Sequence, residues 1–144
     1  MKNLLILFIF IYQFTSCGTD RGEEVIYNYS VKNESGRIIK IKSFQNYPHN
    51  MTVVNTQNVI IPINGNLPTS IKVRPGDNYN FTNFFKGDSI VVIFDNTKKL
   101  FLSAKDITNT RNPLNVTLYS KPNETFIFNV EDYNSAIPCV GFCE

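Results

Sequence analysis

The chain has 144 residues and a formal net charge of +2, with 14 basic and 12 acidic side chains. This length suits one domain and is too short for two ordinary ones. Such a balanced charge, without a basic stripe interleaved with aromatic residues, excludes the usual kind of nucleic-acid-binding surface. The composition leans towards Asn, Ile, Phe, Tyr, Thr and Val. Because β-branched and aromatic residues favour strands and Asn favours turns, an all-β domain is indicated, although an AT-rich genome would give much the same bias.

The N-terminus has the layout of an export signal. One lysine, Lys2, precedes the apolar run 4–12, and small or polar residues then lead to Cys17. A positive start, a short apolar stretch and a small-residue exit are typical of a secretory signal peptide. Nine apolar residues are about half of what a membrane-spanning helix needs. A buried strand or a short core helix is the alternative for this run.

The residues around the first cysteine are Phe14-Thr15-Ser16-Cys17-Gly18, and they resemble the lipobox of bacterial lipoproteins. The resemblance implies that the signal, residues 1–16, is cut before Cys17 and that the thiol of Cys17 carries lipid. Phe14 departs from the family, in which Leu is the commonest residue at that position. An ordinary secreted protein is the alternative. Residues 17–24 are polar and glycine-containing, and are expected to form the lipidated cysteine and a flexible tether to a membrane.

Segments of strand character then follow one another from residue 25 to residue 144. A turn at 33–36 is expected to make a hairpin into the second strand, in which Ile39 and Ile41 alternate with Lys40 and Lys42. The run 90–94 does not alternate and is expected to be a central strand, joined by a hairpin turn at 95–98 to the next strand. Asn129 is expected to cap one short helical turn ending at Ser135. The expected strands are 25–31, 38–42, 52–54, 58–61, 70–73, 79–81, 90–94, 100–102, 116–119 and 125–128.

This pattern of short strands predicts a single antiparallel β-sandwich over residues 25–144, immunoglobulin-like or related, with one short C-terminal helical turn. A small barrel is the alternative. The stretches 129–139 and 93–99 are similar to small uncharacterised lipoproteins of Bacteroidota. That resemblance implies a lipid-anchored protein of the cell envelope, at the outer membrane, on its periplasmic or its surface face. It implies no particular activity.

Cys139 and Cys143 enclose three residues near the C-terminus. Outside the cytoplasm two neighbouring cysteines usually pair, so a structural disulfide is expected. Free thiols and a redox or metal site are the alternatives, but redox motifs usually have two intervening residues. A zinc site would need two further ligands, and His49, in a predicted loop, is the only histidine.

Side chains that could carry chemistry are scattered along the chain. An acid/base pair such as Asp88 and Glu124 would suit a hydrolase, and the stretch 77–80 has alternating oxygen ligands for calcium. Turn chemistry explains most of these carboxylates equally well. Among the aromatic residues, Tyr79, Phe81, Phe84 and Phe85 fit core packing better than a ligand surface. The carboxylates considered are Asp77, Asp88, Asp95, Asp106, Glu124, Glu131 and Asp132.

The sequence therefore predicts a membrane-anchored envelope lipoprotein that is a non-catalytic binding or structural module, without metal or cofactor. Its partners would be the membrane, through lipid on Cys17, and an envelope protein or glycan. A small envelope hydrolase or glycan-processing accessory is one alternative. An inhibitor or immunity lipoprotein is another, and one protruding rigid loop would be its mark.

Overall fold

The computed structural model describes residues 22–45, 52–141 and 143, with backbone alone for 52–58. The elements among these residues are strands and two short helices. They are β1 (Val25–Asn33), β2 (Ile39–Gln45), β3 (Thr52–Ile61), β4 (Asn66–Val73), α2 (Phe81–Phe85), β5 (Ser89–Phe94), β6 (Lys98–Ser103), β7 (Asn123–Phe128), α3 (Val130–Ser135) and β8 (Ile137–Pro138).

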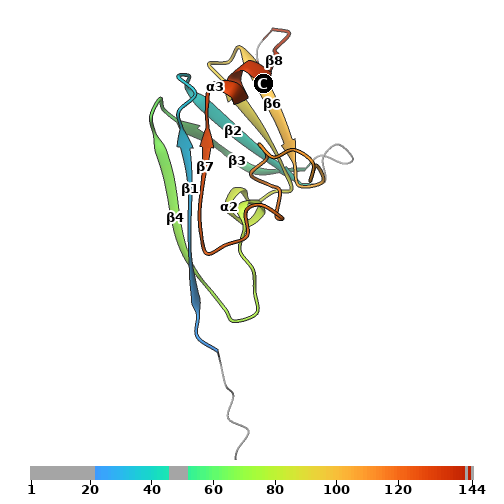
Figure 1. The fold of residues 1–144 in the computed structure, drawn as a ribbon. Helices are drawn as coiled ribbons and strands as arrows, with labels where there is room; N and C mark the ends of the chain where they lie inside the picture. The colour runs from blue at the N-terminus through green and yellow to red at the C-terminus, as the bar shows by residue number, and fades with distance from the viewer. Residues whose placement is uncertain (1–21, 46–51, 142, 144) are drawn as a thin grey trace, which may run out of the picture.

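The strands form two sheets, which confirms the predicted all-β class. One sheet has three strands in the order β4-β1-β7, and the other has five in the order β3-β2-β5-β6-β8. In Figure 1 the two sheets form two layers, with α2 near one end of them and α3 near the other. β1 enters the fold at the end away from α3.

One hydrophobic core joins the two sheets. In β1 the alternate residues Tyr27, Tyr29 and Val31 are buried, while the residues between them are exposed or half-exposed, as expected of a strand with one face in the core. The core also takes residues from β2, β5, β7 and α2. Its largest fully buried members include Tyr29, Phe81, Phe94, Phe126, Phe128, Ile39 and Ile41.

The run 90–94 is confirmed as a central strand, because β5 lies third of five in its sheet. The hairpin from β5 to β6 is also confirmed. Asp95 and Asn96 adopt left-handed backbone conformations, with φ of 48° and 55°. The Thr97 amide donates to the Phe94 carbonyl at 2.9 Å, closing the turn. Two such residues in succession are typical of turns that match the twist of a hairpin.

The expected hairpin at 33–36 is wrong, since β1 and β2 belong to different sheets. The buried amide of Asn33 organises this connection instead. Its Nδ2 donates to the carbonyls of Arg37 at 2.7 Å and Ile61 at 2.9 Å, and its Oδ1 accepts from the Ser35 amide at 3.1 Å. A side chain that satisfies backbone groups on both sides of the turn lets the chain pass from one sheet to the other.

One strand pairing also differs from the antiparallel expectation. β1 pairs with β7 in parallel, with Val31 opposite Phe126, whereas the other five pairings are antiparallel. The two strands lie far apart in the sequence, which is what a parallel pair requires.

Two expected strands are not strands. Residues 79–81 lead into α2, because Asn80 is its N-cap and shares a capping box with Asn83. Residues 116–119 form turns, since Asn115 accepts hydrogen bonds from the Thr117 amide at 3.1 Å and hydroxyl at 2.6 Å. Such local bonds compete with a strand ladder.

The segments 52–54 and 58–61 are one strand, β3, and the two-residue β8 was not expected.

Candidate functional site

The cysteines, the histidine and the aromatic residues singled out in the sequence divide into three groups. Cys17 and His49 lie outside the described residues. Cys139 and Cys143 form the predicted disulfide, with their Cα atoms 5.3 Å apart. The aromatic residues of 79–85 pack in or against the core, as expected, with Phe81 and Phe85 buried.

The candidate acid/base pair is divided between the two sheets. Glu124 lies on β7, where its Oε1 accepts from the Lys121 amide at 3.2 Å. Asp88 lies immediately before β5, on the other sheet, and its Oδ1 accepts from the Ser89 hydroxyl at 3.0 Å. The two carboxylates are therefore held by separate local contacts on separate elements.

Several other polar side chains considered as ligands take part in capping and turn structure. Asn80 caps α2, and Asp106 accepts from the Thr108 amide at 3.3 Å. Asp95 accepts from the Ile38 amide at 2.8 Å and pairs with Arg37. Within the described part of the chain, no three His, Cys, Asp or Glu side chains are grouped so that they could hold a metal ion.

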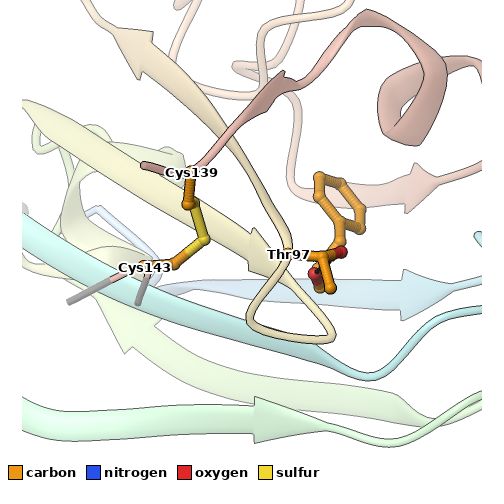
Figure 2. Close-up of a disulfide and its surroundings, with 4 residues drawn as sticks. Thr97, Cys139 and Cys143 are labelled. Atoms are coloured by element: carbon orange, nitrogen blue, oxygen red, sulfur yellow. Dashed lines mark hydrogen bonds between the residues drawn. A yellow bond between two sulfur atoms is a disulfide. The ribbon is translucent and has the colours of Figure 1, made fainter. Parts of the chain in front are cut away.

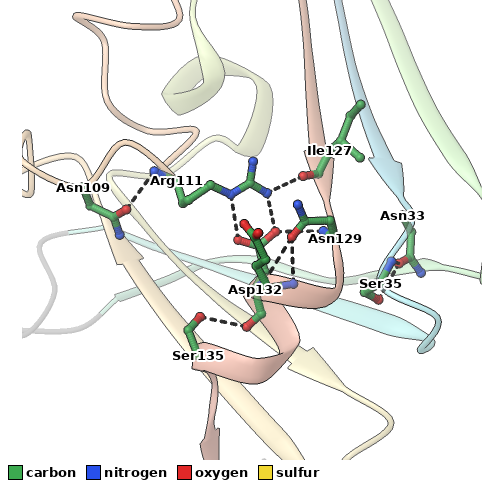
Figure 3. A network of polar contacts seen from close by, with 9 residues as sticks. Asn33, Ser35, Asn109, Arg111, Ile127, Asn129, Asp132 and Ser135 are labelled. Carbon is green, nitrogen blue, oxygen red and sulfur yellow. Dashed lines mark hydrogen bonds and ion pairs between the residues drawn. The ribbon is translucent and has the colours of Figure 1, made fainter.

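A polar network around Asp132 fixes the C-terminal helix. Arg111 holds the buried carboxylate of Asp132 through two hydrogen bonds, one of them from Nε to Oδ1 at 3.1 Å, and also donates to the Ile127 carbonyl at 2.6 Å. The backbone amide of Asn129 donates to the same carboxylate at 2.8 Å and completes the capping box that begins α3 (Figure 3). Asp132 raises the pKa of Arg111 by hydrogen bonding, although burial of the guanidinium opposes that effect.

Tyr133 ties the same helix to the five-stranded sheet. Its ring meets the Phe94 ring at 5.7 Å between centroids. Two cations lie over the Tyr133 ring, Arg37 at 4.9 Å and Lys98 at 4.5 Å from its centroid. Lys98 also donates to the Tyr133 carbonyl at 3.3 Å. Cation–π and edge-to-face contacts of this kind stabilise the packing beyond the burial of apolar area. The helix α3 is therefore held at Asp132 by Arg111 and at Tyr133 by the five-stranded sheet.

From α3 the chain passes directly into β8 and the disulfide loop, residues 139–143. Ile137 pairs with Lys99 on β6, and the Cys139 amide donates to the Thr97 carbonyl at 2.9 Å. Figure 2 shows the disulfide near the hairpin turn that carries Thr97. At the other end of the disulfide loop, Cys143 is buried. Both ends of the loop are therefore held by the fold.

The disulfide loop presents an apolar side chain to solvent. Val140 is fully exposed, and Ile137 beside the loop is 61% exposed. Gly141 has φ of 81°, a left-handed conformation that favours glycine. The loop lies at the end of the molecule opposite to the start of β1 (Figure 1).

The outer face of the three-stranded sheet carries a shallow depression of about 560 Å³. Its lining is mostly amides and hydroxyls, and two pairs of these side chains are bonded across strands. Asn28 donates to Asn123 at 2.8 Å, and the hydroxyls of Ser30 and Thr125 are 2.8 Å apart. Glu124 is the one carboxylate that lines this depression.

Sequence reasoning missed Arg111, because its partner Asp132 is 21 residues away and on another element. It considered Asp132 only as one of several carboxylates that could carry chemistry. The sequence does contain a signal for the capping role of Asp132. It lies three residues after the capping residue Asn129, and this is the spacing of a capping box.

No family model matches this chain, and comparisons with curated proteins and with solved structures found no match either. Among the residues that the structure describes, no helix is both long enough and apolar enough to cross a membrane.

Proposed function

We propose that this chain is an exported bacterial lipoprotein, anchored to the cell envelope by lipid on Cys17, whose β domain is a non-catalytic binding module. The domain contacts a protein partner through the disulfide loop 139–143. The membrane attachment is supported by the signal-like N-terminus and the lipobox-like residues 14–18. The outer membrane is the proposed location, in line with the resemblance of the sequence to Bacteroidota lipoproteins.

The observation that carries the binding role is a fully exposed Val140 on a loop that is fixed at its base. An exposed apolar side chain gains free energy when a partner covers it. A segment whose ends, at Cys139 and Cys143, are already held loses less conformational entropy on binding, so more of that gain appears as affinity. The Arg111–Asp132 network and the β6–β8 pairing supply the order at the base of the loop.

The same observation supports the inhibitor or immunity lipoprotein as a second candidate, because one protruding rigid loop is the feature such a protein would use. The hydrolase alternative receives less support. It needs two carboxylates that converge on one cleft, and Asp88 and Glu124 stand on separate sheets.

Photo-crosslinking in the intact cell envelope tests the binding role. A photoreactive amino acid at position 140 should give a discrete adduct with a partner protein. The same group at position 32, on the exposed outer face of β1, is the matched control and should give none. The adduct should also disappear in the double variant Cys139→Ser/Cys143→Ser, which frees the loop. Equal crosslinking from both positions would count against the proposal.

A further inference from the structure

The outer face of the five-stranded sheet combines lysines with apolar side chains. Residues that alternate with the buried core positions of β2, β5 and β6 point to this face. We call it the lysine face. It consists of Lys40, Lys42, Lys99, Ile60, Val91, Ile93, Phe101 and Ile137.

The strand register places these residues in rows across the sheet. One row runs from Ile60 through Lys40, Ile93 and Lys99 to Ile137. Neighbouring strands are about 4.8 Å apart, so each lysine in the row is flanked by apolar side chains on both sides. Ile93, between the two lysines, is 1% exposed although it is not part of the core between the sheets. Ile93 lines a depression together with Ile38, Lys40 and Ile60, and the aliphatic stem of a lysine is apolar enough to pack beside such neighbours.

Apolar side chains at the margins of the lysine face remain exposed to solvent. Ile60 is 63% exposed and Phe101 is 41% exposed, and Ile137 at the opposite edge from Ile60 is exposed too. Exposed apolar side chains that gather on one face, rather than scattering singly, mark an interaction surface.

The charge on this sheet has one sign. Its five strands contain four lysines and no Asp or Glu. Lys98 turns to Tyr133, and the other three lysines belong to the lysine face. Asp95, in the β5–β6 turn, lines a shallow depression together with Lys40, Ile60 and Ile93, and its carboxylate is paired with Arg37 at 3.4 Å. The lysine face is therefore complementary to a negatively charged surface.

We infer that the lysine face docks on an anionic lipid surface. Lysine side chains reach the phosphate groups while their stems stay among apolar atoms, and exposed Ile and Phe side chains enter the boundary between headgroups and acyl chains. Lysines distributed among apolar residues on one sheet face suit a lipid surface, which offers phosphates and acyl chains everywhere and does not require a partner of matching shape. A second copy of this chain fits poorly, because a two-fold interface would set lysines against lysines.

This inference goes beyond the proposed function, and it is tested without the lipid on Cys17. Among the described residues the core begins at Tyr27, so a chain of residues 18–144 retains every core residue that the structure describes. Its binding is measured by co-sedimentation with vesicles of phosphatidylcholine containing phosphatidylglycerol, and with vesicles of phosphatidylcholine alone. We expect clear binding to the first kind of vesicle, weaker binding to the second, and a loss of binding as salt is raised.

The decisive comparison uses two triple variants with the same change in net charge. Lys40→Gln/Lys42→Gln/Lys99→Gln removes the charges of the lysine face, and each lysine near an anionic surface strengthens binding by about fivefold. Affinity for the anionic vesicles should therefore fall by about tenfold or more. The control Lys32→Gln/Lys72→Gln/Lys121→Gln, at exposed positions elsewhere, should lower it by about twofold at most.

Phe101→Ser, which keeps the charge, should also weaken vesicle binding while circular dichroism shows an intact fold. Equal losses in the two triple variants, or wild-type binding that does not distinguish the two kinds of vesicle, would overturn the inference and leave an acidic protein as the occupant of the face. The chain tested lacks Cys17, so vesicle binding or its absence says nothing about the lipid anchor. The binding role of the disulfide loop is likewise tested only by the crosslinking at position 140.

Discussion

At the scale of single residues, Asp132 has the most demanding environment among the described acids. Its side chain is 2% exposed, and it accepts hydrogen bonds from Arg111 and from the Asn129 amide. A buried carboxylate is tolerated only where charge and hydrogen bonds compensate for lost water. Here they do, and among the described residues no buried polar side-chain atom lacks a partner.

Asp132→Ala should lower the free energy of unfolding by about 3 kcal/mol, because it leaves the partly buried guanidinium of Arg111 without its partner and removes the Asp132 half of the capping box. Glu131→Ala is the matched control. Glu131 lies in the same first turn but is exposed, so its loss should cost less than about 1 kcal/mol. Urea unfolding followed by circular dichroism measures both, and equal costs would contradict the role given to Asp132.

Tyr29 makes the stability of the fold depend on pH. Burial, with a contribution from the charge of Glu124, raises its pKa from 10.0 to about 12. The folded chain therefore holds this proton more firmly than the unfolded chain does. Its contribution to stability is complete below pH 10 and is lost as the pH rises towards 12.

The variant Tyr29→Phe should reduce this loss of stability between pH 10 and 12. It should also lower stability at pH 8 by about 1 kcal/mol, because the one hydroxyl hydrogen is shared between the carbonyls of Tyr79 at 2.9 Å and Lys121 at 3.0 Å. Denaturant unfolding at a series of pH values measures both effects. Parallel pH curves for wild type and variant would show that Tyr29 does not contribute to the slope.

At the scale of elements, the disulfide loop is separable from the rest of the fold. The double variant Cys139→Ser/Cys143→Ser opens a loop of five residues, so chain entropy limits the cost to about 2 kcal/mol. The global unfolding transition should persist, while amide exchange at 139–141 accelerates strongly. Exchange in β5 should change little and serves as the internal reference. Similar acceleration in both places would mean that the disulfide supports the whole fold.

Elements with local signals are the ones that the sequence predicted. The helix α3 follows from its capping residue Asn129, and the β5–β6 hairpin follows from Asp95-Asn96 between two apolar runs. The errors lie where local patterns are ambiguous. Tyr79-Asn80-Phe81 alternates like a strand, but the capping box of Asn80 starts a helix. In 116–119 the side chain of Asn115 takes the hydrogen bonds that a strand would need.

At the scale of the whole molecule, the assignment of strands to sheets was beyond the sequence. Alternation in β1 and β2 shows that each has one buried face, but it does not show which strands are neighbours. The turn at Asn33 looks like a hairpin and instead joins two sheets, and the parallel partner of β1 is β7, far along the chain. The lysine face follows from that arrangement, because Lys40 and Lys99 meet around Ile93 only through strand pairing.

The proposed account places a small all-β domain at a membrane, with a rigid loop for a partner and a lysine face for lipid. Its central claim is the anchor on Cys17, and mass spectrometry of the protein extracted from bacterial membranes tests it most directly. The account predicts a mature chain that begins at Cys17 and carries the added mass of lipid, and predicts that Cys17→Ala abolishes both. A mature chain that begins elsewhere, or begins at Cys17 without lipid, would contradict it.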